Sequence, residues 1–443
     1  MEKSKRFEAK CLGLNEYGQG LILDNKKTVP VANLLPSERA LIANEANGVY
    51  RVHRILKASP NRVNPQCGIY ERCGGCHLLH MNYSMQLEFK KDYVRECYKN
   101  YKINPKIEEI ILAEKTTGYR NKMQVAFKYR ENKIIYGFYE EGSHRLIPMS
   151  ECLVQTGIQL QILKEIQSLM TKLRIQPYNE DKRTGIIRFV LIKEGFTSKE
   201  LMVVIITNSE IFPARSEFLK ALLTKFPQIT TIIQNVNSRK TSIILGNDER
   251  ILYGNGYIED TLLGYKFRIT SKSFFQINPE QTEKLYSKVI AMAGFTGTET
   301  VIDAYSGVGT IGIILSSHVG RVIAVENNQQ AVKAAIANAK LNGVKNVHFV
   351  CDDATPFLQE MAKNKEKVDA IIMDPPRSGA TEKFLAAIKE LKPQKLIYVS
   401  CEAATQARDI NFLNPDYQIQ KMVLVDLFVG TYHVETIALL TRK

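Results

Sequence analysis

Hydrophobic residues in the last third of the chain form short apolar runs separated by amphipathic stretches. The runs are rich in β-branched residues, as expected for strands that are covered on both faces. They lie at 301–304, 322–326, 347–351, 370–374 and 396–401. Helical segments alternate with them, which predicts an α/β fold with a doubly wound parallel sheet. Two later strands, near 422–426 and 436–440, are separated by a short connection, so we expect an antiparallel pair at the sheet edge.

A helix with clear start and stop signals opens this region. Asn278 and Pro279 suit a helix start, and Gly294 suits its end, with apolar Leu285 and Val289 between them. The strand and helix alternation begins near residue 263. We therefore expect a separate unit over residues 263–443.

The first two thirds of the chain have a different pattern. Residues 6–58 alternate short apolar runs with turn residues, which predicts a small β-barrel of the OB type at 1–60. Mixed strands and helices follow, so we expect a central unit over 61–262. Within it, residues 119–130 alternate like a half-buried strand. Met123, Val125, Phe127 and Tyr129 would lie on one face, and Lys122, Gln124, Lys128 and Arg130 on the other.

Charge narrows the class of partner. The 443-residue chain carries a net charge of +14, which favours an anionic partner such as nucleic acid, although a generally basic protein would have the same balance. The basic face at 119–130 could bind RNA, or it could equally be the solvent-exposed outer face of a sheet. No apolar run is long enough to span a bilayer, and the start lacks a signal peptide. We therefore expect a cytoplasmic protein without membrane contact. We also expect a monomer.

A glycine-rich turn follows the first strand of the predicted sheet. Gly307, Gly309 and Gly312 would let the backbone approach a ligand closely, as in nicotinamide-dependent oxidoreductases and in methyltransferases. Glu326 ends the second strand and could bind ribose hydroxyls in either class. Asp352 and Asp353 end the third, where a carboxylate could accept a hydrogen bond from an adenine amino group.

The fourth and fifth strands distinguish these two classes. Asp374 is followed by two prolines, which keep the chain extended as it leaves the sheet. Ligands of open α/β sheets bind outside the carboxyl ends of the strands. Four acidic residues and one thiol are expected at these ends: Asp303, Glu326, Asp353, Asp374 and Cys401.

Cys401 and the late carboxylate Glu435 indicate a particular chemistry. Carbon 5 of uracil is a weak nucleophile until a thiolate adds to carbon 6, and the resulting enolate can attack a sulfonium methyl group. A base must then remove the carbon 5 proton. Glu435, in the turn between the last two strands, could reach the same crevice. His433 fits a structural role as well as a catalytic one.

With these residues the chain resembles the bacterial RNA uracil-5-methyltransferases, especially the iron–sulfur branch that acts on ribosomal RNA. The resemblance covers nearly the whole chain and includes SFFQIN (273–278), DAYSGVGT (303–310), DPPRSG (374–379), YVSC (398–401) and HVE (433–435). It implies a class I, Rossmann-like methyltransferase domain, an amino-terminal TRAM barrel and a central α+β domain with an iron–sulfur cluster. It also implies that Cys401 is the nucleophile and Glu435 the base. The implied S-adenosylmethionine contacts are Gln276, Tyr305, Glu326, Asp353 and Asp374.

Two positions depart from the family pattern. Glu402 stands where the family usually has Asn after the nucleophile, and Val429 stands where Pro is usual. A carboxylate close to the thiol would raise the pKa of Cys401 and slow its ionisation. Because the nucleophile, base and cofactor residues are present, we still expect a working enzyme.

Four cysteines form a further candidate site. Cys67, Cys73 and Cys76 are close in sequence, and the resemblance supplies Cys152 as the fourth ligand. Four thiolates suit zinc or an iron–sulfur cluster. The resemblance favours a [4Fe–4S] cluster over zinc, with a structural role in the RNA-binding region.

The sequence therefore predicts a methyltransferase that forms 5-methyluridine in RNA, most consistently 23S ribosomal RNA. The target base must leave its stack to reach Cys401. A transfer RNA uridine methyltransferase has the same chemistry. A nicotinamide-dependent oxidoreductase would leave Asp374, Cys401 and Glu435 unexplained, and a non-catalytic RNA-binding protein is the non-enzymatic alternative.

Overall fold

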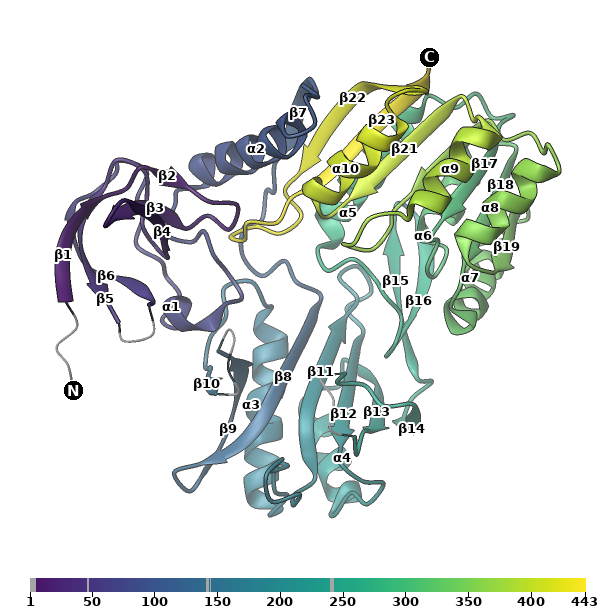
Figure 1. The fold of residues 1–443 in the computed structure, drawn as a ribbon. Helices are drawn as coiled ribbons and strands as arrows, with labels where there is room; N and C mark the ends of the chain where they lie inside the picture. Colours follow the sequence, from purple (N-terminus) through teal and green to yellow (C-terminus); the bar gives the residue numbers. More distant parts are fainter. Residues whose placement is uncertain (1–4, 46–47, 141–142, 144, 240–242) are drawn as a thin grey trace.

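The computed structural model describes residues 5–45, 48–140, 143, 145–239 and 243–443. The chain forms three groups of elements around a central region of loops (Figure 1). The largest group is a twisted sheet of eight strands in the order β19-β18-β17-β20-β21-β23-β22-β7. Its strands are β7 Ile107–Ile111, β17 Thr300–Ala304, β18 Arg321–Glu326, β19 Val347–Cys351, β20 Ala370–Met373, β21 Lys395–Ser400, β22 Tyr417–Val425 and β23 Glu435–Arg442.

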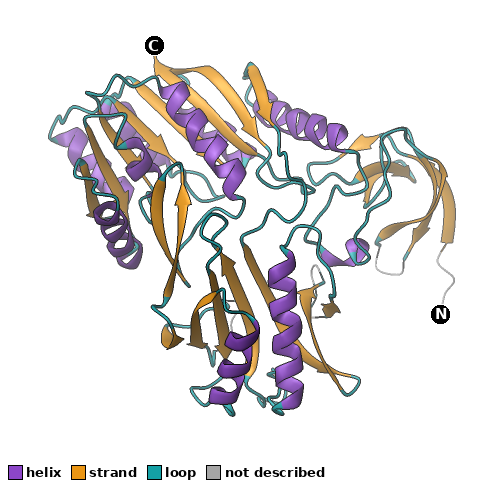
Figure 2. Ribbon diagram, turned by 180° about the vertical axis from the view of Figure 1, so that it is seen from behind, coloured by secondary structure: helices purple, strands orange, loops and turns teal. Residues whose placement is uncertain are grey.

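Five of these strands, β17 to β21, pair in parallel, as the apolar runs predicted. Helices cover both faces of the sheet (Figure 2). One apolar core joins the sheet to α8, α9 and α10, and the other joins it to α5, α6 and α7. These helices are α5 Pro279–Ala293, α6 Thr310–Leu315, α7 Gln329–Leu341, α8 Ala354–Lys363, α9 Glu382–Leu391 and α10 Ala403–Leu413. The predicted signals of α5 are confirmed, because Asn278 accepts a hydrogen bond from the Gln281 N–H and Gly294 ends the helix in the left-handed conformation.

The edge of this sheet differs from the prediction. β22 and β23 are antiparallel, but β7 pairs in parallel with β22 and forms the edge instead. The helix before β7, α2 Tyr83–Lys99, packs against α10, and its Val94 and Tyr98 are fully buried in the same core. Residues 83–111 therefore pack with the carboxyl-terminal sheet, although the sequence assigns them to the central segment.

The central group is a seven-stranded sheet in the order β10-β9-β8-β11-β12-β13-β14, covered on one face by α3 Gly157–Lys172 and α4 Arg215–Lys225. The predicted alternation holds for Met123, Val125 and Phe127, which are buried, but Tyr129 is 55% exposed. A hairpin, β15 Tyr257–Leu262 and β16 Tyr265–Thr270, follows. The strands are β8 Lys122–Arg130, β9 Lys133–Tyr139, β10 Leu146–Pro148, β11 Ile187–Glu194, β12 Leu201–Thr207, β13 Ile229–Val236 and β14 Asp248–Tyr253.

The amino-terminal group has six short strands in two three-stranded sheets, β1-β5-β6 and β2-β3-β4, around a small apolar core. A short helix, α1 Tyr70–Cys73, follows in the cysteine-rich segment. The strands are β1 Lys5–Lys10, β2 Gly13–Leu14, β3 Gly20–Asp24, β4 Lys27–Val31, β5 Arg39–Asn44 and β6 Tyr50–Lys57. Every helix of the described residues falls short of the length and apolarity that crossing a membrane requires.

Candidate active site

Cys401 lies at the carboxyl end of β21, in the turn that leads into α10. Burial, together with the Glu435 and Asp374 carboxyl groups, raises the pKa of its thiol to about 11. Arg377 donates a hydrogen bond to the thiol and opposes this shift. The structure therefore brings together Cys401, Glu435 and Asp374, three predicted residues that follow or begin neighbouring strands of one sheet.

Glu435 and Asp374 form an acidic pair in which Glu435 is buried and Asp374 is partly buried. Glu435 is 3% exposed, and burial together with Asp374 raises its pKa well above the usual range. Burial also raises the pKa of Asp374 to about 7. Two neighbouring carboxyl groups do not both ionise readily, because each charge destabilises the other. The pair therefore retains a proton near neutral pH, and Arg377 is the cation beside it.

Glu402 does not act on the thiol as the sequence led us to expect. Its carboxylate accepts a hydrogen bond from the Tyr93 hydroxyl of α2 and caps α10 by accepting from the Ala404 N–H. The groups that raise the pKa of Cys401 are Glu435 and Asp374. The departure from Asn at this position therefore provides a helix cap that is tied to α2.

A pocket at the glycine-rich turn contains three of the predicted cofactor contacts. Gln276, Tyr305 and Asp374 line it together with Ser306 and Gly307. Tyr305 has φ +65°, a left-handed conformation that costs a non-glycine residue energy. This backbone leads directly into the turn. Gly309 has φ +80°, and a Cβ there would lie 2.9 Å from the Phe349 ring, so only glycine fits.

The predicted acidic residues around this pocket have distinct surroundings. The Glu326 carboxylate accepts hydrogen bonds from Gly307 N–H (3.0 Å) and Asn328 N–H (2.8 Å), which fix its direction. Asp353 caps α8 by accepting from Thr355 N–H at 2.7 Å, and it lies close enough to Tyr305 to raise the pKa of that hydroxyl. Asp303 is fully buried and supports the turn through Gly312 N–H.

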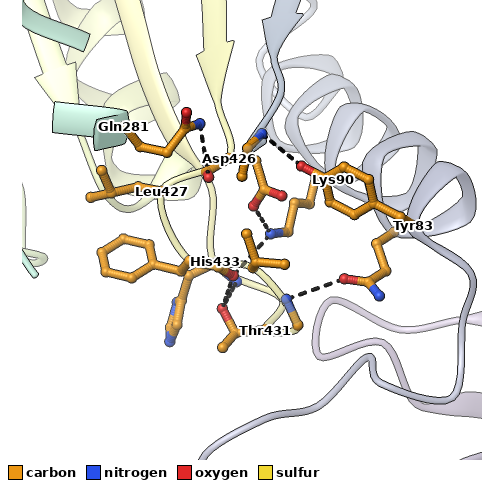
Figure 3. Close-up of polar contacts among 12 residues, drawn as sticks. Tyr83, Lys90, Gln281, Asp426, Leu427, Thr431 and His433 are labelled. Atoms are coloured by element: carbon orange, nitrogen blue, oxygen red, sulfur yellow. Dashed lines mark hydrogen bonds and ion pairs between the residues drawn. The ribbon is translucent and has the colours of Figure 1, made fainter. Parts of the chain in front are cut away.

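The loop between β22 and β23, residues 426–434, is held by donors from several distant segments. Each of its first five carbonyl oxygens accepts a hydrogen bond from a group outside the loop. Figure 3 shows the contacts that Gln281 and Lys90 make with this loop. In order along the loop, the donors are the side chains of Gln281, Asn278, Lys90 and Tyr119, and then the backbone N–H groups of His77 and Leu78. Because this loop leads directly into Glu435, these contacts fix the approach of that carboxyl group.

Lys90 makes the strongest of these contacts. Its ammonium group lies 2.5 Å from an Asp426 carboxylate oxygen and 3.1 Å from the Phe428 carbonyl oxygen, and both charged side chains are 0% exposed (Figure 3). Burial lowers the pKa of Lys90, and the Asp426 carboxylate counteracts this. A fully buried ion pair of this kind tolerates the loss of neither partner.

His433 lies beside Arg377, with 3.4 Å between its Nε2 and an Arg377 Nη. Burial lowers the pKa of His433 to about 4, and the Arg377 charge contributes to the shift. The imidazole is therefore neutral at physiological pH, which excludes a role as a cationic acid.

The four predicted cysteine ligands line one cavity of about 310 Å³. Arg120 lines the same cavity, and its Nε is buried without a hydrogen-bond partner in the described part of the chain. No three His, Cys, Asp or Glu side chains among the described residues are arranged to hold a single metal ion. Cys67, Cys73, Cys76 and Cys152 thus share a cavity without meeting at one point.

Sequence reasoning missed Arg377, Lys90 and Tyr93. Arg377 stands within DPPRSG, so its motif was visible but its contact with the thiol was not. For Lys90 a signal existed, because Gln86, Lys90 and Val94 are four residues apart and so share the apolar stripe of α2. A lysine in such a stripe indicates a buried partner.

Comparisons with known proteins identify the family of the chain. A family model described as tRNA (Uracil-5-)-methyltransferase matches residues 82–443. An uncharacterized RNA methyltransferase of Halalkalibacterium halodurans is 36% identical over 100% of this chain and 98% of its own length. Another, of Staphylococcus aureus, is 38% identical over 97% of this chain and 96% of its own.

A solved structure is similar over almost the same extent. It is the tRNA (uracil-54, C5)-methyltransferase of Pyrococcus abyssi in complex with S-adenosyl-L-homocysteine, with a TM-score of 0.79 and 25% identity over 98% of this chain and 99% of that one. Together with the family match, this similarity shows a mixed α/β methyltransferase fold. The chain belongs to the RNA uracil-5-methyltransferase family and is an S-adenosylmethionine-dependent enzyme that acts on RNA.

Proposed function

We propose that this enzyme methylates carbon 5 of a uridine in 23S ribosomal RNA through a covalent adduct with Cys401. One observation carries the proposal: the Cys401 thiol lies within electrostatic reach of the Glu435 carboxyl group, beside the pocket that Asp374 lines. A thiol next to a base is unnecessary for methylating nitrogen or oxygen but is required to activate carbon 5.

The proposed reaction uses each group once. The Cys401 thiolate forms a bond to carbon 6, and the electron pair of the carbon 5–carbon 6 double bond moves into an enolate. When bound, S-adenosylmethionine would supply an electrophilic methyl group: carbon 5 would bond to this methyl group as its bond to the sulfonium sulfur breaks, which leaves S-adenosylhomocysteine. The ionised Glu435 carboxylate, with the proton of the acidic pair on Asp374, then takes the carbon 5 proton, the sulfur–carbon 6 bond breaks, and the double bond returns. Arg377, which donates to the thiol, stabilises its anionic form.

The raised pKa of Cys401 predicts the pH dependence of adduct formation. Below a pKa of about 11 the thiol is protonated, so the thiolate fraction rises roughly tenfold per pH unit between pH 7 and pH 9. We expect the rate of adduct formation with 5-fluorouridine RNA, measured in a single turnover, to follow this slope. Fluorine blocks proton removal at carbon 5, so Glu435 does not contribute. A rate that is flat over this range would contradict the prediction.

We assign cofactor binding to the residues around the glycine-rich turn. Glu326 retains free lone pairs for ribose hydroxyls although two backbone N–H groups already orient it. Gln276, Tyr305 and Asp374 would hold the rest of the cofactor, and Asp353 would accept from its adenine amino group. The pocket combines the fixed backbone of the glycine-rich turn with the Asp374 carboxylate. This combination suits a ligand that carries both hydroxyl groups and a positive charge.

We also propose that Cys67, Cys73, Cys76 and Cys152 hold a [4Fe–4S] cluster. A zinc ion with four Zn–S bonds of about 2.3 Å needs its sulfur atoms roughly 3.8 Å apart. Thiols spread around a cavity of about 310 Å³ fit a larger, multi-iron group better. Arg120 would offset part of the negative charge of four thiolates. No step of the methyl transfer needs the cluster.

Replacing Cys76 by serine tests this role. We expect bound iron and the visible absorbance of the purified protein to fall sharply, because one of four ligands is lost. His77 and Leu78, the next residues, hold the Gly430 carbonyl oxygen, so the variant should also be more sensitive to proteolysis near residue 430. A Cys351→Ser variant, at an exposed cysteine outside this cavity, is the matched control. Equal iron content in both variants would rule out the cluster assignment.

RNA contacts would come from the amino-terminal and central groups of elements. We propose that residues 1–60 form a TRAM-like, OB-type barrel and that residues 61–262 form the RNA-binding region that holds the cluster. Residues 263–443 would form the methyltransferase domain. We expect the protein to be a cytoplasmic monomer. The net charge of +14 supports a polyanionic substrate.

Transfer RNA is the second candidate substrate. The similarity to a tRNA (uracil-54, C5)-methyltransferase over 98% of the chain favours it, whereas the four cysteines favour 23S ribosomal RNA through the iron–sulfur branch. Mapping 5-methyluridine in ribosomal and transfer RNA from cells with and without the gene distinguishes them. Loss of modification only in transfer RNA would replace our assignment, and unchanged modification in both would refute the proposed function.

A further inference from the structure

Four aromatic rings from three distant segments meet beside the active site. Tyr17 contacts Tyr432 with ring centroids 5.4 Å apart, and Tyr432 also contacts His77 at 4.5 Å and His433 at 4.2 Å. Tyr17 belongs to the amino-terminal group, His77 to the cysteine-rich segment, and Tyr432 and His433 to the loop before Glu435. The rings therefore join three parts of the chain at one place.

These rings lie between two open cavities. Tyr17 and Tyr432 line both a cavity of about 1170 Å³ and a second of about 370 Å³. His433 and Arg377 line the larger one, and Arg377 also contacts the Cys401 thiol. The ring cluster thus extends from solvent to Arg377, the residue that contacts the Cys401 thiol.

Exposure distinguishes this cluster from an ordinary core. Tyr17 is 49% exposed, and Tyr432, His77 and His433 are each partly exposed. A cluster that only fastened the amino-terminal group to the loop would gain most by burying its rings fully. Accessible ring surface in a cavity is instead suited to a planar ligand.

Charge indicates which part of an RNA faces this cavity. The larger cavity is also lined by carboxylates, including Glu16, Glu88, Asp92 and Glu96. Glu88, Asp92 and Glu96 are paired with Lys91, Arg95 and Lys99 of the same helix, so this wall has no excess of positive charge to hold phosphate groups. An uncharged, flat nucleobase does not need such an excess.

We propose that Tyr17 and Tyr432 form a stacking site for a nucleobase adjacent to the uridine that enters the active site. This inference rests on the proposed function, since it places the target uridine at Cys401. When a uridine leaves its stack, the neighbouring base loses a stacking partner. An aromatic side chain can take the place of that partner, and the binding energy gained depends little on which base it is. The site would recognise the single-stranded shape of the substrate rather than its sequence.

Steady-state kinetics on ribosomal RNA from cells lacking the gene provide the first test. Tyr17→Ala and Tyr432→Ala should each raise KM about tenfold, the typical value of one stacked base. Tyr17→Phe should keep the wild-type KM, because the ring and not the hydroxyl does the binding. Tyr253→Ala, at a tyrosine that is 45% exposed and lines neither cavity, should also keep it. KM changes below twofold in both alanine variants, or a Tyr17→Phe variant as impaired as Tyr17→Ala, would overturn the proposal.

A binding measurement separates this proposal from the methyl transfer itself. In a Cys401→Ala background, a nine-nucleotide oligouridylate with one internal 2-aminopurine should lose fluorescence on binding, because stacking quenches this base. Adding Tyr17→Ala should restore the emission of the bound oligonucleotide, and adding Tyr253→Ala should not. Bound oligonucleotide without quenching, or quenching that persists without Tyr17, refutes the stacking site. Quenching that depends on Tyr17, together with no methylation of any RNA by the wild-type enzyme, refutes the proposed function alone.

Discussion

Cys401→Ala should form no covalent adduct with RNA that contains 5-fluorouridine, and should methylate natural RNA at least about 10⁴-fold more slowly than the wild-type enzyme. Without the thiol, carbon 5 stays too weakly nucleophilic to accept a methyl group, whatever the rest of the site provides. Denaturing gel electrophoresis of labelled RNA measures the adduct, and transfer of a labelled methyl group measures the rate.

Glu435→Gln is the matched control for this experiment. It removes the base but keeps the nucleophile and the size of the side chain, so methylated RNA should remain attached to the protein. Removing the Glu435 carboxyl group should also lower the pKa of Cys401, because this group contributes to raising it in the wild-type protein. Adduct formation by Cys401→Ala, or equal behaviour of the two variants, would contradict the assigned roles.

Lys90→Met should destabilise the protein by about 3–5 kcal/mol, which is typical when one partner of a buried ion pair is removed. Methionine fills a similar volume but leaves the Asp426 carboxylate buried without its cation. The Phe428 carbonyl oxygen also loses a donor, which loosens the loop that leads into Glu435. The midpoint of urea unfolding gives the stability change, and kcat should fall as well.

Two further variants identify the cause. Lys91→Met removes the neighbouring charge, which belongs to a partly exposed pair with Glu88, and should cost less than about 1 kcal/mol. Lys90→Met combined with Asp426→Asn removes both buried charges and should recover part of the lost stability. An unfolding midpoint for Lys90→Met that matches Lys91→Met would show that the buried pair contributes little.

The parallel sheet could be predicted because its strands are buried on both faces and so appear as apolar runs. The Asn278 cap and the Gly294 stop are equally local signals. β7 was missed because Ile107–Ile111 is half exposed and pairs with β22, far along the chain, a contact that no local pattern encodes. The same limit explains why the sequence did not indicate that α2 packs against α10.

The candidate site also has features that could be predicted from the sequence and features that could not. Cys401, Asp374 and Glu435 could be brought together from the sequence because the ends of adjacent strands meet at one edge. The direction of the Glu402 side chain could not, since it depends on Tyr93, a residue about 300 positions earlier. Surrounding contacts of this kind arise only from tertiary packing.

The position of β7 also constrains the order in which the chain can fold during synthesis. α2 and β7 leave the ribosome long before β22, the strand that completes their pairing, which is made about 300 residues later. Until then Val94 and Tyr98 of α2 lack the sheet core that covers them in the native structure, and closing so long a loop carries an entropic cost. The synthesis of β22 therefore completes the pairing that holds α2 and β7 in their native positions.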